Sequence, residues 1–170
     1  LILGKPSLFQ FGLMIAVLVL LFDFWKKPQF RICLLMIFGL LMVWVKHPLT
    51  NEVTMVDVGQ GDSIFLRSMK GDTILIDVGG KVTFGAKEKW QESSQTSNAE
   101  KTLIPYLQAR GVSKIDHLVL THTDTDHIGD LEEVAKRFKI KEICVSQGAL
   151  TKSSFVKRLR TIKCPVHTLK

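Results

Sequence analysis

Four side chains that commonly bind metal ions lie within six residues of one another. His122, Asp124, Asp126 and His127 are interleaved with threonines, between a short apolar segment and an amphipathic one. One carboxylate in such a place is explained as a helix N-cap, but four potential ligands together are not. Imidazole and carboxylate ligands suit Mn²⁺, Mg²⁺ or Zn²⁺. The segment therefore predicts a site for divalent metal.

The spacing of these side chains suggests room for two ions. In a short extended loop, His122, Asp124 and Asp126 point one way, while His127 turns to the other side of the bend. Two neighbouring cations could then be held by one peptide. The three cysteines have no CxxC or zinc-finger spacing, so we interpret them as apolar filling rather than as metal ligands.

Two glycine-containing segments precede the histidines. In residues 56–63 (VDVGQGDS), a tight hairpin turn at the glycines explains the sequence. The alternative is a backbone nest in which Gly61, Asp62 and Ser63 approach a phosphate. Residues 76–80 (IDVGG) contain Asp77, which a turn before two glycines would also explain.

The hydrophobic pattern predicts an α/β arrangement that positions these motifs. We expect an antiparallel meander of strands at residues 53–58, 63–68 and 73–78, and a loop at 81–98. Further strands are expected at 117–121, 142–145 and near Val166, and helices around 103–107, at 131–138 and at 153–161. Ser153 or Ser154 is the expected cap of the last helix, and Asp130 the expected cap of the helix before it.

The N-terminal part of the chain is apolar on every face. Residues 8–25 and 30–45 would span roughly 27 and 24 Å as helices, which predicts a transmembrane hairpin. Its basic connection contains Lys26, Lys27 and Arg31, so the positive-inside rule places it in the cytoplasm and residues after 46 outside the cytoplasmic membrane. We thus expect a multi-pass protein of the cell membrane. The domains would be 1–46, a linker at 47–52 and 53–170, in a piece of a longer chain.

Positive charge is concentrated near the C-terminus. The net charge is +7, and residues 131–170 carry ten Lys or Arg against three Glu. Lys157, Arg158 and Arg160 could face a polyanion such as DNA, although solvated helix faces are the stronger explanation of the pattern. Disordered, collagen-like and coiled-coil classes are excluded by the aromatic content and by the absence of glycine or heptad repeats.

Residues 121–129 (THTDTDHIG) resemble the HxHxDH signature of the metallo-β-lactamase superfamily, with Asp124 where the second His usually stands. Together with VDVGQGDS and IDVGG, they resemble the C-terminal domain of the ComEC family, membrane channels of bacterial DNA uptake. The resemblance implies a partial metallo-β-lactamase-like αββα sandwich preceded by the two-helix transmembrane hairpin. It also implies that His122 and Asp124 bind one metal ion, and Asp126 and His127 the other. Asp77 would support residues 121–129, which we call the metal loop, through hydrogen bonds.

The functional expectation follows from this resemblance. The chain would be part of a DNA-uptake channel protein for natural transformation, with a metal-dependent phosphodiesterase (nuclease) domain in which Asp126 orients the nucleophile. Its partners would be DNA, the membrane, other uptake machinery and the remainder of its own chain; further ligands would lie beyond residue 170, so this piece alone would be inactive. The alternatives are a DNA-guiding module without catalysis and a small-molecule hydrolase such as a lactonase.

Overall fold

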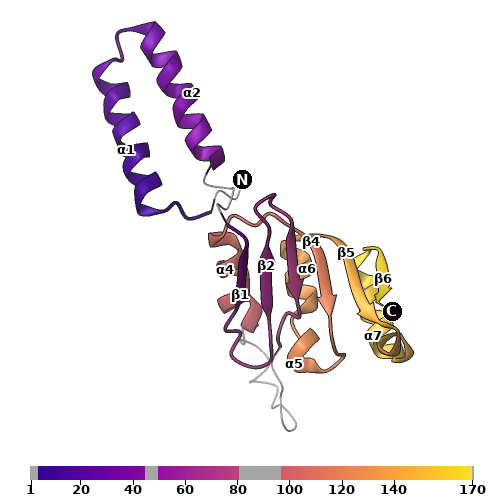
Figure 1. Ribbon diagram of the computed structural model, residues 1–170. Coiled ribbons are helices and arrows are strands. Elements are labelled where there is room, and N and C mark those ends of the chain that lie inside the picture. The colour runs from indigo at the N-terminus through magenta and orange to yellow at the C-terminus, as the bar shows by residue number, and fades with distance from the viewer. Residues whose placement is uncertain (1–3, 45–49, 81–96, 170) are drawn as a thin grey trace, which may run out of the picture.

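The computed structural model describes residues 4–44, 50–80 and 97–169. A pair of helices extends away from an α/β unit in which one sheet carries helices (Figure 1). Residues 47–49 of the expected linker at 47–52 and most of the expected loop at 81–98 lie outside the described residues, and Glu52 already belongs to the first strand.

Two antiparallel helices form the N-terminal part of the described chain. Helix α1 spans Leu8–Asp23 and α2 spans Pro28–Trp44. Ser7 begins α1 with a capping box, in which its hydroxyl accepts from the Gln10 amide at 3.2 Å while the Gln10 side chain accepts from the Ser7 amide at 2.9 Å. Most of the apolar side chains in both helices are exposed. None of the described helices combines the length and hydropathy needed to span a bilayer, so the predicted transmembrane hairpin is not confirmed.

In the described part of the chain, six strands form one mixed sheet in the order β1-β2-β3-β4-β5-β6. The first three strands are an antiparallel meander, as the sequence predicted, and β3 to β6 run parallel. Their bounds are β1 Glu52–Met55, β2 Ile64–Arg67, β3 Thr73–Ile76, β4 Lys114–Leu120, β5 Lys139–Ser146 and β6 Val166–Leu169.

Helices connect the parallel strands. A π-helical turn, η1 (Ala99–Leu103), continues into α4 (Ile104–Ala109), so the helix changes form next to Pro105, which has no backbone N–H to donate. The other elements are α5 Thr125–Ile128, α6 Leu131–Arg137, the 3₁₀ turn η2 Gln147–Thr151 and α7 Ser153–Ile162. The predicted serine cap of α7 is wrong, because Lys152 occupies the N-cap position and no side chain caps the helix.

The hydrophobic core lies on one face of the sheet. Leu118 and Ile143 from the central strands pack there with Leu107 of α4, Val134 of α6 and Phe155 of α7. Because side chains alternate along a strand, the neighbouring residues in each strand face the other way. On that second face, which we call the open face, Val53 and Met55 are exposed. The described residues thus supply one sheet with helices on one side, a mixed α/β layer in agreement with the predicted partial sandwich.

Candidate metal centre

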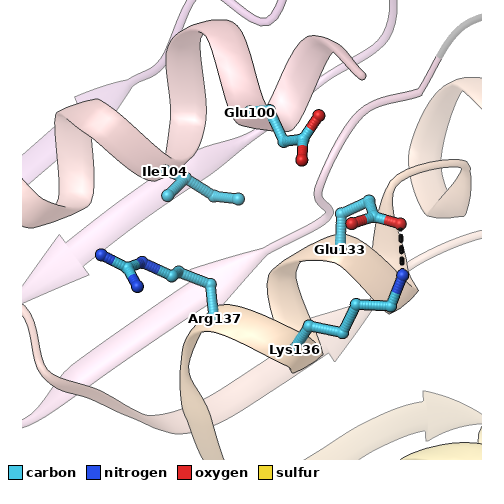
Figure 2. A pocket seen from close by; sticks show the side chains of 5 residues that line it. All are labelled: Glu100, Ile104, Glu133, Lys136 and Arg137. Carbon is cyan, nitrogen blue, oxygen red and sulfur yellow. Dashed lines mark hydrogen bonds and ion pairs between the residues drawn. The ribbon is translucent and has the colours of Figure 1, made fainter. Parts of the chain in front are cut away.

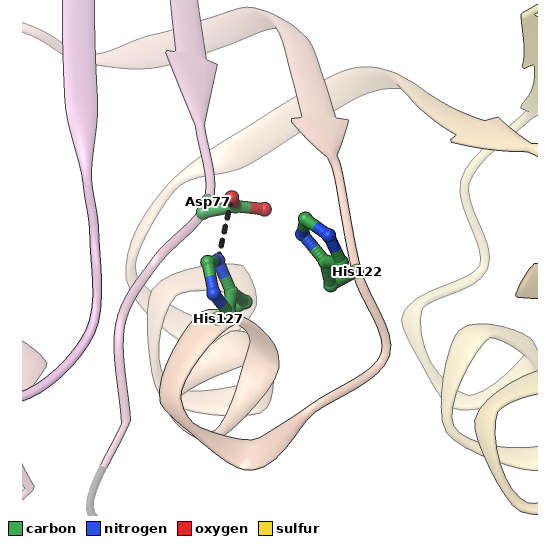
Figure 3. A group of neighbouring side chains, drawn as sticks. All are labelled: Asp77, His122 and His127. Carbon is green, nitrogen blue, oxygen red and sulfur yellow. Dashed lines mark hydrogen bonds and ion pairs between the residues drawn. The ribbon is translucent and has the colours of Figure 1, made fainter.

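Three side chains from two separate parts of the chain meet at the C-terminal edge of the parallel strands. Asp77 follows β3, His122 follows β4 and His127 lies in α5. In Figure 3 the carboxylate and the two imidazole rings surround a common space. One potential ligand atom from each residue lies within 4.8 Å of the other two. Strands β3 and β4 are parallel neighbours, so their C-terminal ends lie at the same edge of the sheet, where α/β proteins build their sites.

Asp77 connects the elements of this site. Its side chain is buried, and its Oδ1 accepts a hydrogen bond from the Thr121 amide at 2.8 Å. Its Oδ2 accepts from the Thr121 hydroxyl and from Nδ1 of His127, the latter at 2.9 Å. The backbone of Asp77 has a φ of 55°, in the left-handed region that residues other than glycine seldom adopt. These contacts join the end of β3 to the end of β4 and to α5, as a residue that supports the loop would.

The hydrogen bond from Asp77 determines how the His127 ring is oriented. Because Nδ1 is engaged by the carboxylate, Nε2 is the nitrogen that remains for a metal ion, an arrangement common among metal-binding histidines. This hydrogen bond raises the pKa of His127 more than burial lowers it, and the negative charges of Asp126 and Asp62 raise it further. The site is therefore electronegative and favours a cation.

The metal loop is more compact than the sequence suggested. The Ile128 amide donates to the Asp124 carbonyl at 3.0 Å and the Gly129 amide to the Thr125 carbonyl at 2.7 Å, which makes residues 125–128 a helical turn. The expectation of an extended loop with His127 on the opposite side is therefore wrong. The ring centroids of His122 and His127 lie 4.9 Å apart, so both histidines face the same space.

The two glycine segments pack directly against this helical turn. Gly61 has a φ of 81°, and a Cβ added to it would lie 1.6 Å from the Asp126 carbonyl oxygen. A Cβ on Gly80 would lie 2.0 Å from the Thr125 carbonyl oxygen. Gly79 also forms a β-bridge with Ile128. The three motifs are thus one structural unit, in which absent side chains allow the backbone to approach the metal loop closely.

Comparison with known proteins agrees with this geometry. The family model described as the metallo-beta-lactamase superfamily matches residues 56–159, which contain all three motifs. The chain belongs to the metallo-β-lactamase superfamily. Within it, the donor set fits a divalent cation, because two imidazoles with nearby carboxylates are ligands of Zn²⁺ and Mn²⁺.

Curated relatives of this chain support the resemblance that the motifs indicated. It is 37% identical over 134 residues to ComE operon protein 3 of Bacillus subtilis, and 30% identical over 117 residues to Recombination protein 2 of Haemophilus influenzae. It is 33% identical over 84 residues to Competence protein ComA of Neisseria gonorrhoeae. The matches cover 78%, 69% and 49% of this chain but only 17%, 13% and 10% of the relatives' lengths.

The two other predicted ligands lie at the rim of the candidate metal centre. Oδ2 of Asp126 is 3.8 Å from Nε2 of His127. The Asp124 side chain is 68% exposed, and its Oδ1 is 3.6 Å from Nζ of Lys152. His122, Asp124 and Lys152 share a shallow hollow of about 230 Å³ with η2. Sequence reasoning missed Lys152, because only the return of the chain after β5 brings it beside the metal loop.

Two side chains that we expected to contact phosphate or DNA have partners within the protein. Ser63 is buried, and its hydroxyl donates to the Asp77 carbonyl at 3.0 Å, so it holds the backbone of Asp77 in place. Arg158 turns toward the protein instead of solvent: its Nε donates to Oε1 of Glu132 at 2.6 Å, and its Nη2 donates to the Ile128 carbonyl at 2.8 Å. Gly61, Asp62, Lys157 and Arg160 are exposed and keep the surface position that we expected of them.

Asp130 also differs from its predicted role. It occupies the N-cap position of α6, but its side chain does not cap that helix. Its Oδ2 instead accepts from the Ala99 amide at 2.6 Å, which fastens the start of η1 to the end of the metal loop. Burial raises the pKa of Asp130, although the hydrogen bond from Ala99 opposes the change.

A second hollow, of about 510 Å³, lies between the segment 100–104 and α6 (Figure 2). Lys136 donates to Oε1 of Glu133 at 2.7 Å across its rim. The hollow is lined by charges of both signs, which is typical of a solvated helix surface. Its lining residues are Glu100, Ile104, Glu133, Lys136 and Arg137, none of which belongs to the metal centre.

Proposed function

We propose that this chain forms part of a metal-dependent phosphodiesterase that acts on DNA during natural transformation. The observation that carries the proposal is the site in which Asp77 orients His127 next to His122. The membership of the metallo-β-lactamase superfamily supports metal binding, and the relative named as a competence protein supports the biological process.

The residues that would hold divalent metal, one ion or two, are His122 and His127, with Asp124 and Asp126 at the rim. A divalent cation would supply Lewis-acid chemistry, polarising a phosphoryl oxygen and making water easier to deprotonate. Asp77 fixes the ring of His127 and needs no further role in binding, because both of its carboxylate oxygens already accept hydrogen bonds. Asp126, whose Oδ2 lies 3.8 Å from Nε2 of His127, would accept a hydrogen bond from the attacking water and orient it.

The hollow beside His122 supplies the substrate side of the proposal. Lys152 brings a positive charge to its rim, and the Lys152 side chain is 57% exposed, so it would attract a phosphate. Gly61 and Asp62 lie in the turn that packs against α5 and are exposed at the surface. A phosphodiester placed between Lys152 and the histidines would have a cationic group on one side and the metal ligands on the other.

The test is cleavage of linear DNA by the protein that carries this chain, with and without Mn²⁺. We expect metal-stimulated cleavage that Asp126→Asn abolishes while salt-sensitive DNA binding remains. We expect Lys152→Ala to weaken binding, and Lys163→Ala, at the exposed end of α7, to serve as its control. Binding without any metal-stimulated cleavage would contradict the phosphodiesterase proposal.

A second candidate is a DNA-guiding module without catalysis. Lys157 and Arg160 are exposed and lie three residues apart on α7, so they present two positive charges on one side of the helix. Replacing both by alanine should flatten the salt dependence of DNA binding. In this reading, loss of His122 and His127 would leave DNA transport intact.

We also propose that the protein sits in the cell membrane as a multi-pass protein, with residues after 46 outside the cytoplasmic membrane. The support is the apolar surface of α1 and α2, on which Leu8 and Phe22 are 92% and 84% exposed. The basic connection with Lys26, Lys27 and Arg31 would lie in the cytoplasm. A reporter that is active only outside the cytoplasm, fused after residue 46, should be active; activity of a cytoplasmic reporter alone would contradict this orientation. DNA, other uptake machinery and the remainder of a longer chain are the proposed partners.

A further inference from the structure

Four side chains with metal-binding atoms gather on the open face of the sheet, away from the centre described above. His117 lies on β4, Glu142 and Cys144 on β5, and His167 on β6. The register places His117 beside Glu142 and Cys144 beside His167. Because paired residues on neighbouring strands point to the same face, the three strands present these side chains together.

The distances within this cluster are short. Nδ1 of His117 lies 2.6 Å from Oε1 of Glu142, and Nε2 of His167 lies 3.7 Å from Oε2 of the same carboxylate. One ligand atom each from His117, Glu142 and Cys144 lies within 4.8 Å of the other two. In tetrahedral zinc sites, bond lengths of about 2.0–2.3 Å place neighbouring ligand atoms about 3.3–3.8 Å apart. Movements of about 1 Å would therefore bring these three atoms to zinc-binding geometry, and His167, whose Nε2 faces the same carboxylate, would complete the set.

A simple ion pair between strands does not account for this composition. A His–Glu pair needs only His117 and Glu142, whereas here the second carboxylate oxygen faces a histidine from the opposite neighbouring strand. The thiol of Cys144 is buried at the same place.

We propose that His117, Glu142, Cys144 and His167 bind one Zn²⁺ ion in a structural site. Two imidazoles, a carboxylate and a thiolate are all zinc ligands, and four protein ligands leave no open position for substrate. The ion would join β4, β5 and β6. Strand β6 gains most from this link, because it pairs only with β5 in the described sheet and all of its residues are exposed. The site is independent of the proposed function, since it shares no residue with the metal centre.

Co²⁺ tests the proposal because a thiolate ligand gives cobalt a charge-transfer absorption band in the near ultraviolet. The centre at His122 and His127 contains no thiol among its clustered ligands, so it cannot produce this band. The 170-residue chain, kept in mild detergent without thiol reductants, would be titrated with Co²⁺. We expect the band to saturate at one equivalent, and to persist when His122 and His127 are both replaced by alanine.

Variants identify the ligands. Cys144→Ser should abolish the band, whereas the Cys33→Ser, Cys164→Ser double variant, in which Cys144 is the remaining cysteine, should keep it. His167→Ala should shift the titration midpoint to higher Co²⁺ by about tenfold or more, since even loss of a group that supports a ligand costs about tenfold. No band in the unsubstituted chain, or a band that survives Cys144→Ser, would overturn the proposal. The first of these results needs no variant, so the test holds even if a substitution prevents folding.

Discussion

Replacing Arg158 by leucine should weaken the metal loop without removing any proposed ligand. The guanidinium of Arg158 binds both carboxylate oxygens of Glu132 and donates to the carbonyls of Ile128 and Gly129, the latter two at 2.8 and 3.1 Å. These carbonyls belong to the end of the turn that holds His127. Leucine keeps part of the apolar portion of the arginine side chain, but it removes the guanidinium that donates to all of these acceptors.

The size of the effect follows from the exposure of the pair. The Arg158 and Glu132 side chains are 31% and 35% exposed. Solvent screening at this exposure reduces the value of an ion pair to about 1 kcal/mol. Each hydrogen bond to a carbonyl adds about 0.5–1 kcal/mol. We therefore expect Arg158→Leu to lower the free energy of unfolding by about 2–3 kcal/mol, and the affinity for metal to fall with it.

Amide hydrogen exchange in β4 and β5 measures this loss, because it reports on the sheet separately from α1 and α2. Arg160→Leu is the matched control: it lies on the same helix and is exposed, so its effect should stay within about 0.5 kcal/mol. Adding Glu132→Gln to Arg158→Leu should cost less than the sum of the two single changes. A loss below about 1 kcal/mol for Arg158→Leu would refute the reasoning. An equal loss for Arg160→Leu would also refute it. Weaker DNA binding by Arg158→Leu at unchanged stability would do the same.

Three further predictions concern single residues. Asp77→Asn should reduce metal affinity about 10-fold to 100-fold in a calorimetric titration, because the ring of His127 loses its charged partner; unchanged affinity would exclude that role. Gly61→Ala should destabilise the chain by clearly more than Gly71→Ala in urea unfolding, since both glycines have positive φ but only Gly61 is in close contact with a backbone carbonyl; equal losses would mean that the close approach is unimportant. Burial would raise the pKa of Glu132, but the hydrogen bonds and charge of Arg158 hold it below its usual range. This pair should therefore contribute stability above about pH 4.3 that is lost as the pH falls further, and Arg158→Leu should remove this part of the acid dependence in a pH series of unfolding curves.

The sheet could be predicted from the sequence because the hydrophobic pattern that marks each strand lies within that strand. Alternating apolar residues mark β1 to β3, and short apolar segments mark β4 and β5. In the metal loop, the same kind of alternation led to a wrong prediction. Threonine and aspartate in alternation indicate an extended segment, but the closed turn of α5 depends on Gly80, which packs against it from a distant part of the chain.

The side chains that sequence reasoning misplaced have long-range partners. A basic helix is typical of a DNA-binding surface, yet Arg158 is paired with Glu132 on another helix. Ser63 lies in a turn motif, but its hydroxyl is taken by the backbone of Asp77. Cys144 could be recognised only as apolar filling, because its neighbours His117 and His167 come from other strands and depend on the register.

The measurement that tests the central claim most directly is metal binding by the chain with and without its two site histidines. The titration should use the Cys144→Ser variant, so that the cluster on the open face does not contribute. We predict saturable binding of Zn²⁺ or Mn²⁺ that is lost when His122 and His127 are both replaced by alanine and retained when the exposed His167 is replaced instead. Equal affinity and stoichiometry with and without His122 and His127 would contradict the assignment of the metal centre.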